Sequence, residues 1–204
     1  MTWETIKESI LLAVQQMTWV EGIAVLFALA YIYFAARESI WCWLAAIISV
    51  SLYIYICIRA ELFAETVLQV FYLWMAFYGW YQWNRKKGDD NKRPVIVWPL
   101  KYHLWIIISS AFVTGIVGYL LQIYTTAAVP FLDAFTTVFA LATTYMVTKK
   151  VLENWIYWVV IDAASIFLYS YRGLYLTSAL FLLYTIIAIF GYFHWRKHYL
   201  ESNA

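Results

Sequence analysis

Apolar residues in this chain gather in seven long runs, which are separated by short polar or charged segments. The runs cover residues 20–36, 39–58, 62–83, 100–123, 132–148, 151–170 and 173–195. An α-helix needs roughly 20 mostly apolar residues to cross a bilayer, and the runs are close to that length. None of them alternates apolar and polar residues as a barrel strand does. The pattern predicts an all-α integral membrane protein with seven transmembrane helices.

The apolar pattern occurs twice, with an offset of 112 residues and no gap. The sequence Phe-Ala-Leu-Ala stands at residues 27–30 and again at 139–142, and the spacing Gly-x-x-x-Trp ends both copies, at 79–83 and 191–195. A single helix between the copies makes both cross the membrane in the same direction, as in SWEET transporters. We therefore predict two parallel three-helix repeats joined by a connector helix, with a substrate site between them near the midplane.

The repeat and the charged segments together predict the domain boundaries. We expect an N-terminal interfacial segment at 1–18, the first repeat at 20–83, a cytoplasmic loop at 84–99, the connector at 100–123, the second repeat at 132–195, and a cytoplasmic tail at 196–204. Apolar residues in the first segment recur about one helical turn apart, which suits a short helix lying in the membrane surface. A disordered segment is the alternative.

Composition excludes a soluble protein, because 65% of the residues are hydrophobic and only 13% are charged. The net charge is only +2, so orientation depends on where the basic residues stand. With the N-terminus outside, 11 of the 14 Lys and Arg residues face the cytoplasm. The positive-inside rule therefore predicts an outer N-terminus and a cytoplasmic C-terminus.

Two tryptophans, Trp83 and Trp195, stand at matching positions just ahead of basic residues. Tryptophan is enriched where a helix meets the membrane surface. We interpret both as anchors in the aromatic belt rather than as ligands of a substrate.

Asp162 is the only acidic residue near the middle of a predicted span, and the matching residue in the first repeat is Val50. A carboxylate at that depth costs about 2.5–3.5 kcal/mol on insertion scales, so it should face a cavity or a partner. Arg172 stands ten residues further on, about 15 Å along a helix, which is too far for direct pairing. A hydrogen bond between helices is the alternative role for Asp162.

The residues around Asp162 form one helical face, since spacings of three and four separate Trp155, Trp158, Asp162, Ser165 and Tyr169. Two indoles, a carboxylate and a phenol make a plausible clamp for a flat, positively charged ring. The alternative is that the tryptophans pack against neighbouring helices.

The third run presents a second set of candidate ligands, Gln69, Tyr72 and Trp80, along one side of its helix. The amide of Gln69 can read a carboxamide or a ribose hydroxyl. It can equally join two helices by a hydrogen bond. The small residues Ala76 and Gly79 are expected to allow close helix approach.

Sequence motifs of enzymes are absent. The chain has no His-Glu-x-x-His, Gly-x-Ser-x-Gly or Walker motif, so we expect no catalytic residues and no cofactor. The three histidines, His103, His194 and His198, lack clustered cysteine or carboxylate ligands in the sequence, so we expect no metal site. Nucleic acid is not an expected partner. A membrane sensor or scaffold, whose aromatic faces are contacts between subunits, is the alternative outside transport.

Three stretches, at residues 78–86, 154–162 and 168–176, resemble the PnuC family of bacterial vitamin transporters, chiefly carriers of nicotinamide riboside. They read YGWYQWNRK, NWIYWVVID and LYSYRGLYL. The likeness covers residues 20–197, including the order of three helices, one connector and three helices.

The resemblance implies facilitated diffusion of this form of vitamin B3 through the bacterial inner membrane, followed by trapping in the cytoplasm by a kinase on the way to NAD. It implies substrate binding by the third and sixth helices and by a Trp-x-x-Trp motif, here Trp155 and Trp158. It also implies a homotrimer. Thiamine and riboflavin carriers share the family fold, so these vitamins remain alternative substrates.

Overall fold

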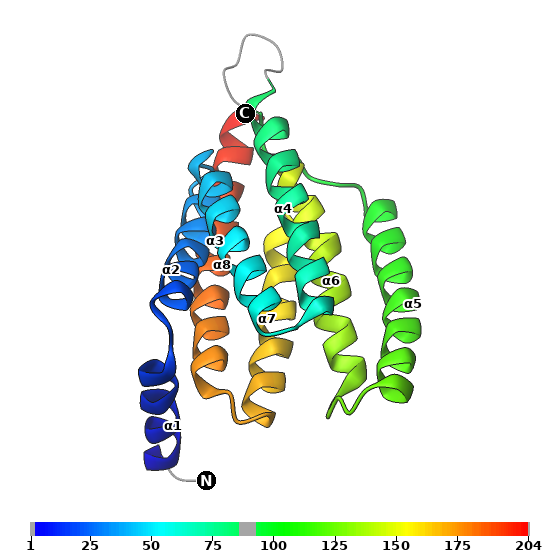
Figure 1. Cartoon of the computed structure of the whole chain (residues 1–204). Coiled ribbons are helices and arrows are strands. Elements are labelled where there is room, and N and C mark those ends of the chain that lie inside the picture. Colours follow the sequence, from blue (N-terminus) through cyan, green and yellow to red (C-terminus); the bar gives the residue numbers. More distant parts are fainter. Residues whose placement is uncertain (1–2, 86–92, 204) are drawn as a thin grey trace. The chain divides into compact units, whose positions relative to one another are not determined.

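The computed structural model describes residues 3–85 and 93–203, which form eight α-helices (Figure 1). The helices are α1 (Trp3–Gln16), α2 (Trp19–Ala36), α3 (Trp41–Arg59), α4 (Phe63–Asn84), α5 (Leu100–Tyr124), α6 (Pro130–Thr148), α7 (Asn154–Tyr171) and α8 (Tyr175–Ser202). The all-α prediction is confirmed. Residues 1–2, 86–92 and 204, which fall in the predicted interfacial segment, loop and tail, lie outside the described residues.

Each of the seven predicted runs coincides with a helix, and α8 continues through most of the predicted tail. Five helices of the described ranges, α2, α3, α5, α6 and α8, are long and apolar enough to cross a membrane. Helices α4 and α7 fall below that hydropathy, because they are rich in tryptophan and tyrosine and include Gln69 and Asp162. The arrangement with seven spans therefore stays a prediction.

The N-terminal segment is helical from Trp3 to Gln16, so of the two alternatives for this segment the helix is found. Its position in the membrane surface stays a prediction. The next helix, α2, begins at a capping box, in which the backbone N–H of Thr18 donates to the Glu21 carboxylate at 2.7 Å and the Thr18 hydroxyl accepts from the Glu21 N–H at 3.3 Å.

The backbone repeats with the same offset as the sequence. The described non-glycine residues with positive φ are Glu38, Glu61 and Lys150, with φ of 54°, 57° and 56°, and Gly173 has φ of 74°. These four residues form two pairs that are each 112 positions apart. Each of the four residues follows a helix that ends in a Schellman motif, in which a backbone N–H donates to the carbonyl five residues earlier. The four closing bonds are Ser39 N–H to Phe34 O (2.9 Å), Leu62 N–H to Cys57 O (2.9 Å), Val151 N–H to Met146 O (3.1 Å) and Leu174 N–H to Tyr169 O (2.8 Å).

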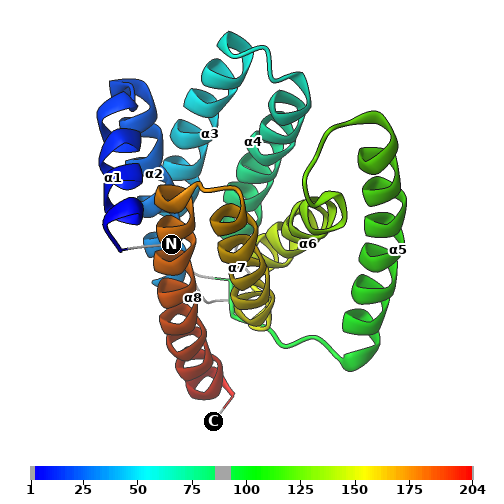
Figure 2. The same cartoon turned by 90° about the horizontal axis from the view of Figure 1, so that it is seen from below.

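The chain divides into two compact units, which are described separately. The first unit contains α1, α5 and α7 with residues 130–144 of α6 and 175–189 of α8. The second unit contains α2, α3 and α4, residues 145–152, and the rest of α8. In this second unit α2 packs against α3 and α3 against α4, and Figure 2 shows α3 and α4 side by side. The units group helices by contact and not by repeat, so the predicted domain boundaries stay predictions.

Helices α3 and α4 approach closely at Gly79, as the sequence predicted for this small residue. A Cβ atom placed there would lie 2.3 Å from the indole ring of Trp43. The Trp43 ring is 1% exposed and meets the Trp83 ring edge to face, with 5.4 Å between the ring centroids. Glycine is therefore needed at position 79 because the indole occupies the space of a methyl group.

The belt-anchor interpretation of Trp83 and Trp195 is wrong, because both indoles are buried, with 6% and 0% exposure. Each Nε1–H donates to a backbone carbonyl, Trp83 to Val147 O at 3.1 Å and Trp195 to Ala35 O at 3.0 Å. The two donors are 112 residues apart in the sequence, and so are the two acceptors. Each tryptophan at the end of one repeat thus bonds to the end of the first helix of the other repeat. We call these two bonds the crossed indole bonds.

Removing one crossed indole bond should destabilise the protein modestly. Trp195→Phe keeps an aromatic ring but loses the N–H donor, while Ala35 O still accepts from the Glu38 N–H at 3.0 Å. We therefore expect a loss of about 1 kcal/mol in free energy of unfolding from the hydrogen bond, and a further loss because the smaller ring leaves a cavity at a fully buried position. Thermal unfolding in detergent would measure it against Trp74→Phe, since Trp74 is 61% exposed. Equal melting temperatures for the two variants would contradict the assignment.

The ends of α2 and α6 are joined by an ion pair between equivalent residues of the repeats. Lys150 Nζ lies 3.0 Å from Glu38 Oε2, and Lys150 is 2% exposed. Burying the ammonium is tolerated because the carboxylate pairs with it. The predicted orientation places the turn at Glu38 and the turn at Lys150 on the same side of the membrane, and the ion pair between these residues agrees with that prediction. Which side is cytoplasmic stays a prediction.

The described end of the predicted loop is fixed to the same turn. Ile96 N–H donates to Lys150 O at 2.9 Å, and Leu152 N–H donates to Ile96 O at 2.8 Å. These two bonds form an isolated parallel β-bridge between Ile96 and Val151. The loop is therefore tied by its backbone before α5 begins.

Candidate substrate-binding site

The predicted ligands of the second repeat lie on the buried face of α7. Trp155, Asp162 and Ser165 are 1%, 1% and 3% exposed, and Trp158 and Tyr169 are half-buried. Residues with exposed side chains, such as Ile156, Val160 and Phe167, lie on the opposite face. The structure therefore brings these predicted residues onto one helix face, while their role as ligands stays a prediction.

Asp162 is the distinctive group of this face. Its Oδ2 atom is buried and has no hydrogen-bond partner among the described residues. Arg172, at the end of the same helix, instead pairs with Asp133 in the first turn of α6. This agrees with the expectation that Arg172 is too distant to pair with Asp162. A buried carboxylate oxygen without a partner is costly unless a ligand, ion or water bonds to it.

The aromatic residues of the face differ in how far protein atoms cover them. Tyr169 stacks on Phe181 of α8 with 5.2 Å between ring centroids and an interplanar angle of 12°. One face of its ring is therefore already covered. Trp158 is half-buried and Trp155 is almost fully buried. Trp158 is thus the indole on this face with more ring surface left for a ligand.

The predicted ligands of the first repeat, Gln69, Tyr72 and Trp80, lie on α4 in the second unit. All three are half-buried and lie on one side of the helix, as the spacing predicted. The α7 residues belong to the first unit, so the structure brings each set together within its own unit.

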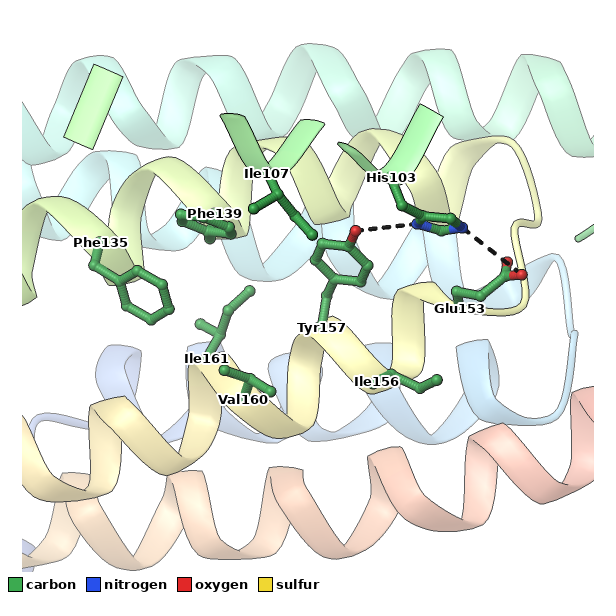
Figure 3. A pocket seen from close by; sticks show the side chains of 9 residues that line it. All are labelled: His103, Ile107, Phe135, Phe139, Glu153, Ile156, Tyr157, Val160 and Ile161. Atoms are coloured by element: carbon green, nitrogen blue, oxygen red, sulfur yellow. Dashed lines mark hydrogen bonds and ion pairs between the residues drawn. The ribbon is translucent and has the colours of Figure 1, made fainter. Parts of the chain in front are cut away.

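A cavity of about 510 Å³ lies in the first unit, between α5, α6 and α7 (Figure 3). Most of its lining is apolar, and one end is polar. His103 Nδ1 lies 3.0 Å from the Tyr157 hydroxyl, and His103 Nε2 lies 3.8 Å from Glu153 Oε1. Figure 3 shows these three side chains in a row, with Tyr157 and Glu153 on either side of the imidazole.

The cavity contains none of the predicted ligands. Its α7 residues, such as Ile156, Tyr157 and Val160, lie on the face of the helix opposite Trp155 and Asp162. It is therefore separate from the predicted substrate face. The sequence gives little signal for this row, since His103 is 54 residues from Tyr157.

Sequence reasoning also missed two polar groups. Asn154 is 0% exposed and opens α7 one residue before Trp155, where its amide adds a polar group to the candidate face. Its position directly before the predicted Trp-x-x-Trp pair is the feature of the sequence that could have identified Asn154 as a candidate. Glu38 lies beside His194 and His198, so the expectation that these histidines lack a carboxylate neighbour is wrong. Glu38 is far from both in sequence, which hid the cluster.

Long apolar helices and a buried carboxylate on an aromatic helix face are the features of a helical membrane protein with a functional site in its interior. A family model described as "Nicotinamide mononucleotide transporter" matches residues 18–197. The chain belongs to this family, which confirms the predicted resemblance.

Curated relatives cover nearly the whole chain. The nicotinamide riboside transporter PnuC of Escherichia coli is 27% identical over 92% of this chain and 89% of its own length. The protein of the same name from Neisseria mucosa is 24% identical over 88% of this chain and 73% of its own length. The riboflavin/roseoflavin transporter RibM of Streptomyces davaonensis is 24% identical over 93% of this chain and 90% of its own length.

A solved structure shares the fold. A crystal structure of the vitamin B3 transporter PnuC superposes with a TM-score of 0.71, covering 97% of this chain and 89% of that chain at 20% identity. At that identity the likeness establishes the fold, and the function has to be argued from the residues.

Proposed function

We propose that this protein carries nicotinamide riboside into the cytoplasm by facilitated diffusion. The observation that carries the proposal is the buried Asp162 carboxylate, whose Oδ2 has no hydrogen-bond partner among the described residues. It lies on an aromatic face in a family of nicotinamide nucleoside and nucleotide transporters. A cationic substrate gives that carboxylate a partner.

The chemistry of the riboside matches the residues of the two faces. Its pyridinium ring is a flat cation, which can stack on Trp158 and Trp155 with a gain of about 0.5–2 kcal/mol. Asp162 offsets the positive charge or accepts a ribose hydroxyl. Gln69 and Tyr72 bond to the carboxamide or the ribose, and Trp80 and Tyr169 complete the aromatic lining.

The charges of these helices favour the riboside over the mononucleotide. Neither α4 nor α7 contains a lysine, arginine or histidine. A phosphate monoester carries about −1.5 to −2 charge at neutral pH and needs basic partners. Beside Asp162 it would meet a like charge. The uncharged ribose is therefore the better match, although the family model is described by the mononucleotide.

Riboflavin is the second candidate, because one relative is named as a riboflavin/roseoflavin transporter. Riboflavin is larger and neutral, so Asp162 would gain no cationic partner. Thiamine is also a cation with flat rings, so only direct measurement can decide whether thiamine or the riboside is the substrate. A membrane sensor or scaffold that transports nothing is the alternative from a different class of protein.

The transport needs neither ATP nor a coupling ion. The riboside moves down its gradient, and a cytoplasmic kinase traps it by phosphorylation, which commits it to NAD synthesis. The protein itself then needs no catalytic residues and no cofactor. The family resemblance supports this scheme, and so does the absence of a Walker motif from the sequence.

The assembly is a homotrimer in the bacterial inner membrane. Each chain crosses the bilayer seven times, as three helices, one connector and three helices, with its N-terminus outside and its C-terminus in the cytoplasm. The 11-to-3 distribution of basic residues supports the orientation. The family resemblance supports the trimer. Native mass spectrometry of the purified protein would test the trimer, and a dimer or monomer would refute it.

Uptake by liposomes that contain the purified protein tests the function. With equal potassium on both sides and valinomycin to dissipate the potential that a moving cation creates, we expect saturable entry of radiolabelled nicotinamide riboside until the inner and outer concentrations are equal. Enclosing a riboside kinase with ATP should raise the accumulated label above that level. Excess unlabelled riboside should compete, and excess nicotinamide mononucleotide or riboflavin should not.

The controls separate the alternatives. Liposomes without protein give the rate of leakage. No uptake of any vitamin would favour a sensor or scaffold, and uptake of riboflavin or thiamine alone would replace the proposed substrate. Uptake that requires a sodium or proton gradient, with the membrane potential held at zero, would refute facilitated diffusion.

A further inference from the structure

A cluster of Glu38, His194 and His198 lies in the second unit, and the proposed transport does not use it. Glu38 follows α2, and the two histidines are one turn apart on α8. One ligand atom from each residue can be chosen so that all three lie within 4.8 Å of one another. His198 Nδ1 is 2.8 Å from Glu38 Oε1, and the two imidazole centroids are 4.9 Å apart.

We propose that this cluster binds a divalent first-row metal ion of the zinc type. Two imidazoles and one carboxylate are a ligand set that zinc takes in proteins, with water in the fourth position. Calcium and magnesium prefer oxygen ligands, so they are not expected to bind here. Histidines at positions i and i+4 point to the same side of a helix, which lets both reach one ion.

The geometry needs only a local adjustment. Tetrahedral ligands at 2.0–2.1 Å from zinc are roughly 3.3 Å apart, so the most widely separated pair of ligand atoms would have to close by at most about 1.5 Å. His198 Nδ1 and Glu38 Oε1 are already closer than the tetrahedral spacing, at 2.8 Å. The His198 side chain is 50% exposed and has room to rotate toward the ion. The Glu38 side chain is 10% exposed and is held in place by its neighbours.

Lys150 positions the carboxylate of this site. Its ammonium lies 3.0 Å from Glu38 Oε2, while Oε1 faces His198. One oxygen therefore remains for the metal when the ion pair is kept. The nearby positive charge of Lys150 lowers the affinity for a cation below that of the same ligands without it.

The bound ion would join the turn after α2 to α8. Trp195 already bonds to Ala35 O between the same two segments, at 3.0 Å. Because the metal binds the folded protein through residues from both segments, it should stabilise this end against unfolding. This inference does not depend on which vitamin is transported.

Calorimetric titration of the full-length protein with zinc chloride tests the site, after removal of any histidine tag. We expect one equivalent of zinc per chain and no heat from magnesium chloride. His198→Gln and His194→Gln should each weaken binding more than about tenfold, since even groups that only support a metal ligand are worth 10–100-fold. His103→Gln is the matched control, because His103 is the one other histidine of the chain and lies outside the cluster.

The melting temperature gives a second measurement on the same proteins. Zinc should raise it for the wild type and for His103→Gln, and should leave it unchanged for the two cluster variants. Unchanged zinc affinity in both His198→Gln and His194→Gln would overturn the proposal. So would an equal loss of affinity in His103→Gln. Glu38→Gln is avoided here, because it would also leave the buried Lys150 ammonium without its carboxylate.

Discussion

Replacing Asp162 with asparagine should lower the affinity for nicotinamide riboside about 10- to 100-fold. A hydrogen bond to a charged group contributes about 1.5–3 kcal/mol, and each 1.4 kcal/mol corresponds to a factor of ten. The asparagine has nearly the same shape but no charge, so it cannot offset the pyridinium cation. Calorimetric titration of the purified variant with the riboside would measure the change.

The fold should tolerate Asp162→Asn, because the Oδ2 atom has no hydrogen-bond partner among the described residues and the neutral amide is cheaper to bury. Asp133→Asn is the matched control. It removes a carboxylate of the same unit that pairs with Arg172. Its affinity for the riboside should stay near that of the wild type.

A neutral ligand would distinguish a charge effect from a change of shape. A neutral ligand that bound to the same face would be affected little by Asp162→Asn, while the riboside would lose most of its affinity. Unchanged binding of the riboside to the folded Asp162→Asn variant would remove Asp162 from the site. The proposed choice of the riboside over neutral vitamins would then lose its main support.

Replacing Gly79 with alanine should destabilise the protein by about 1–3 kcal/mol, the usual cost of overpacking a core. The new methyl group would lie 2.3 Å from the Trp43 indole. Trp43 is 1% exposed and packs against Trp83, so it has little space into which it can move. The higher helix propensity of alanine stabilises the helix by at most about 1 kcal/mol, so the destabilising effect of steric crowding should dominate.

Gly115→Ala provides a control of opposite sign. Gly115 lies in α5, and a Cβ atom there would meet nothing within 4 Å. The substitution should therefore leave stability unchanged or raise it by up to about 1 kcal/mol. Thermal unfolding of both variants in the same detergent would measure the difference. Equal melting temperatures would show that α3 and α4 do not approach at Gly79 as described.

The helices and their repeat could be predicted from the sequence, because their causes are local. Apolar runs of membrane-spanning length form helices wherever they stand, and all seven runs coincide with helices. The repeated offset reappears in the backbone, since Glu38 and Lys150 both end a helix in the left-handed conformation. The buried face of α7 could also be predicted, because helical periodicity fixes which residues share a face.

The roles of particular side chains could be predicted only in part. Trp83 and Trp195 have the composition and position of belt anchors, and hydropathy does not distinguish an indole at the membrane surface from one buried in a core. The hydrogen bonds from both indoles to backbone carbonyls show that these tryptophans are buried in a core. The partner of Trp195 is Ala35, 160 residues away, and only the folded chain brings them together.

By itself, the sequence determined the helices, the repeat and the face that carries Asp162, because each depends on spacing along one segment. Only the tertiary structure decided the crossed indole bonds and the cluster of Glu38, His194 and His198. These contacts join residues that are far apart in the chain. Their formation depends on how the helices pack, and no local pattern of apolar and polar residues records that packing.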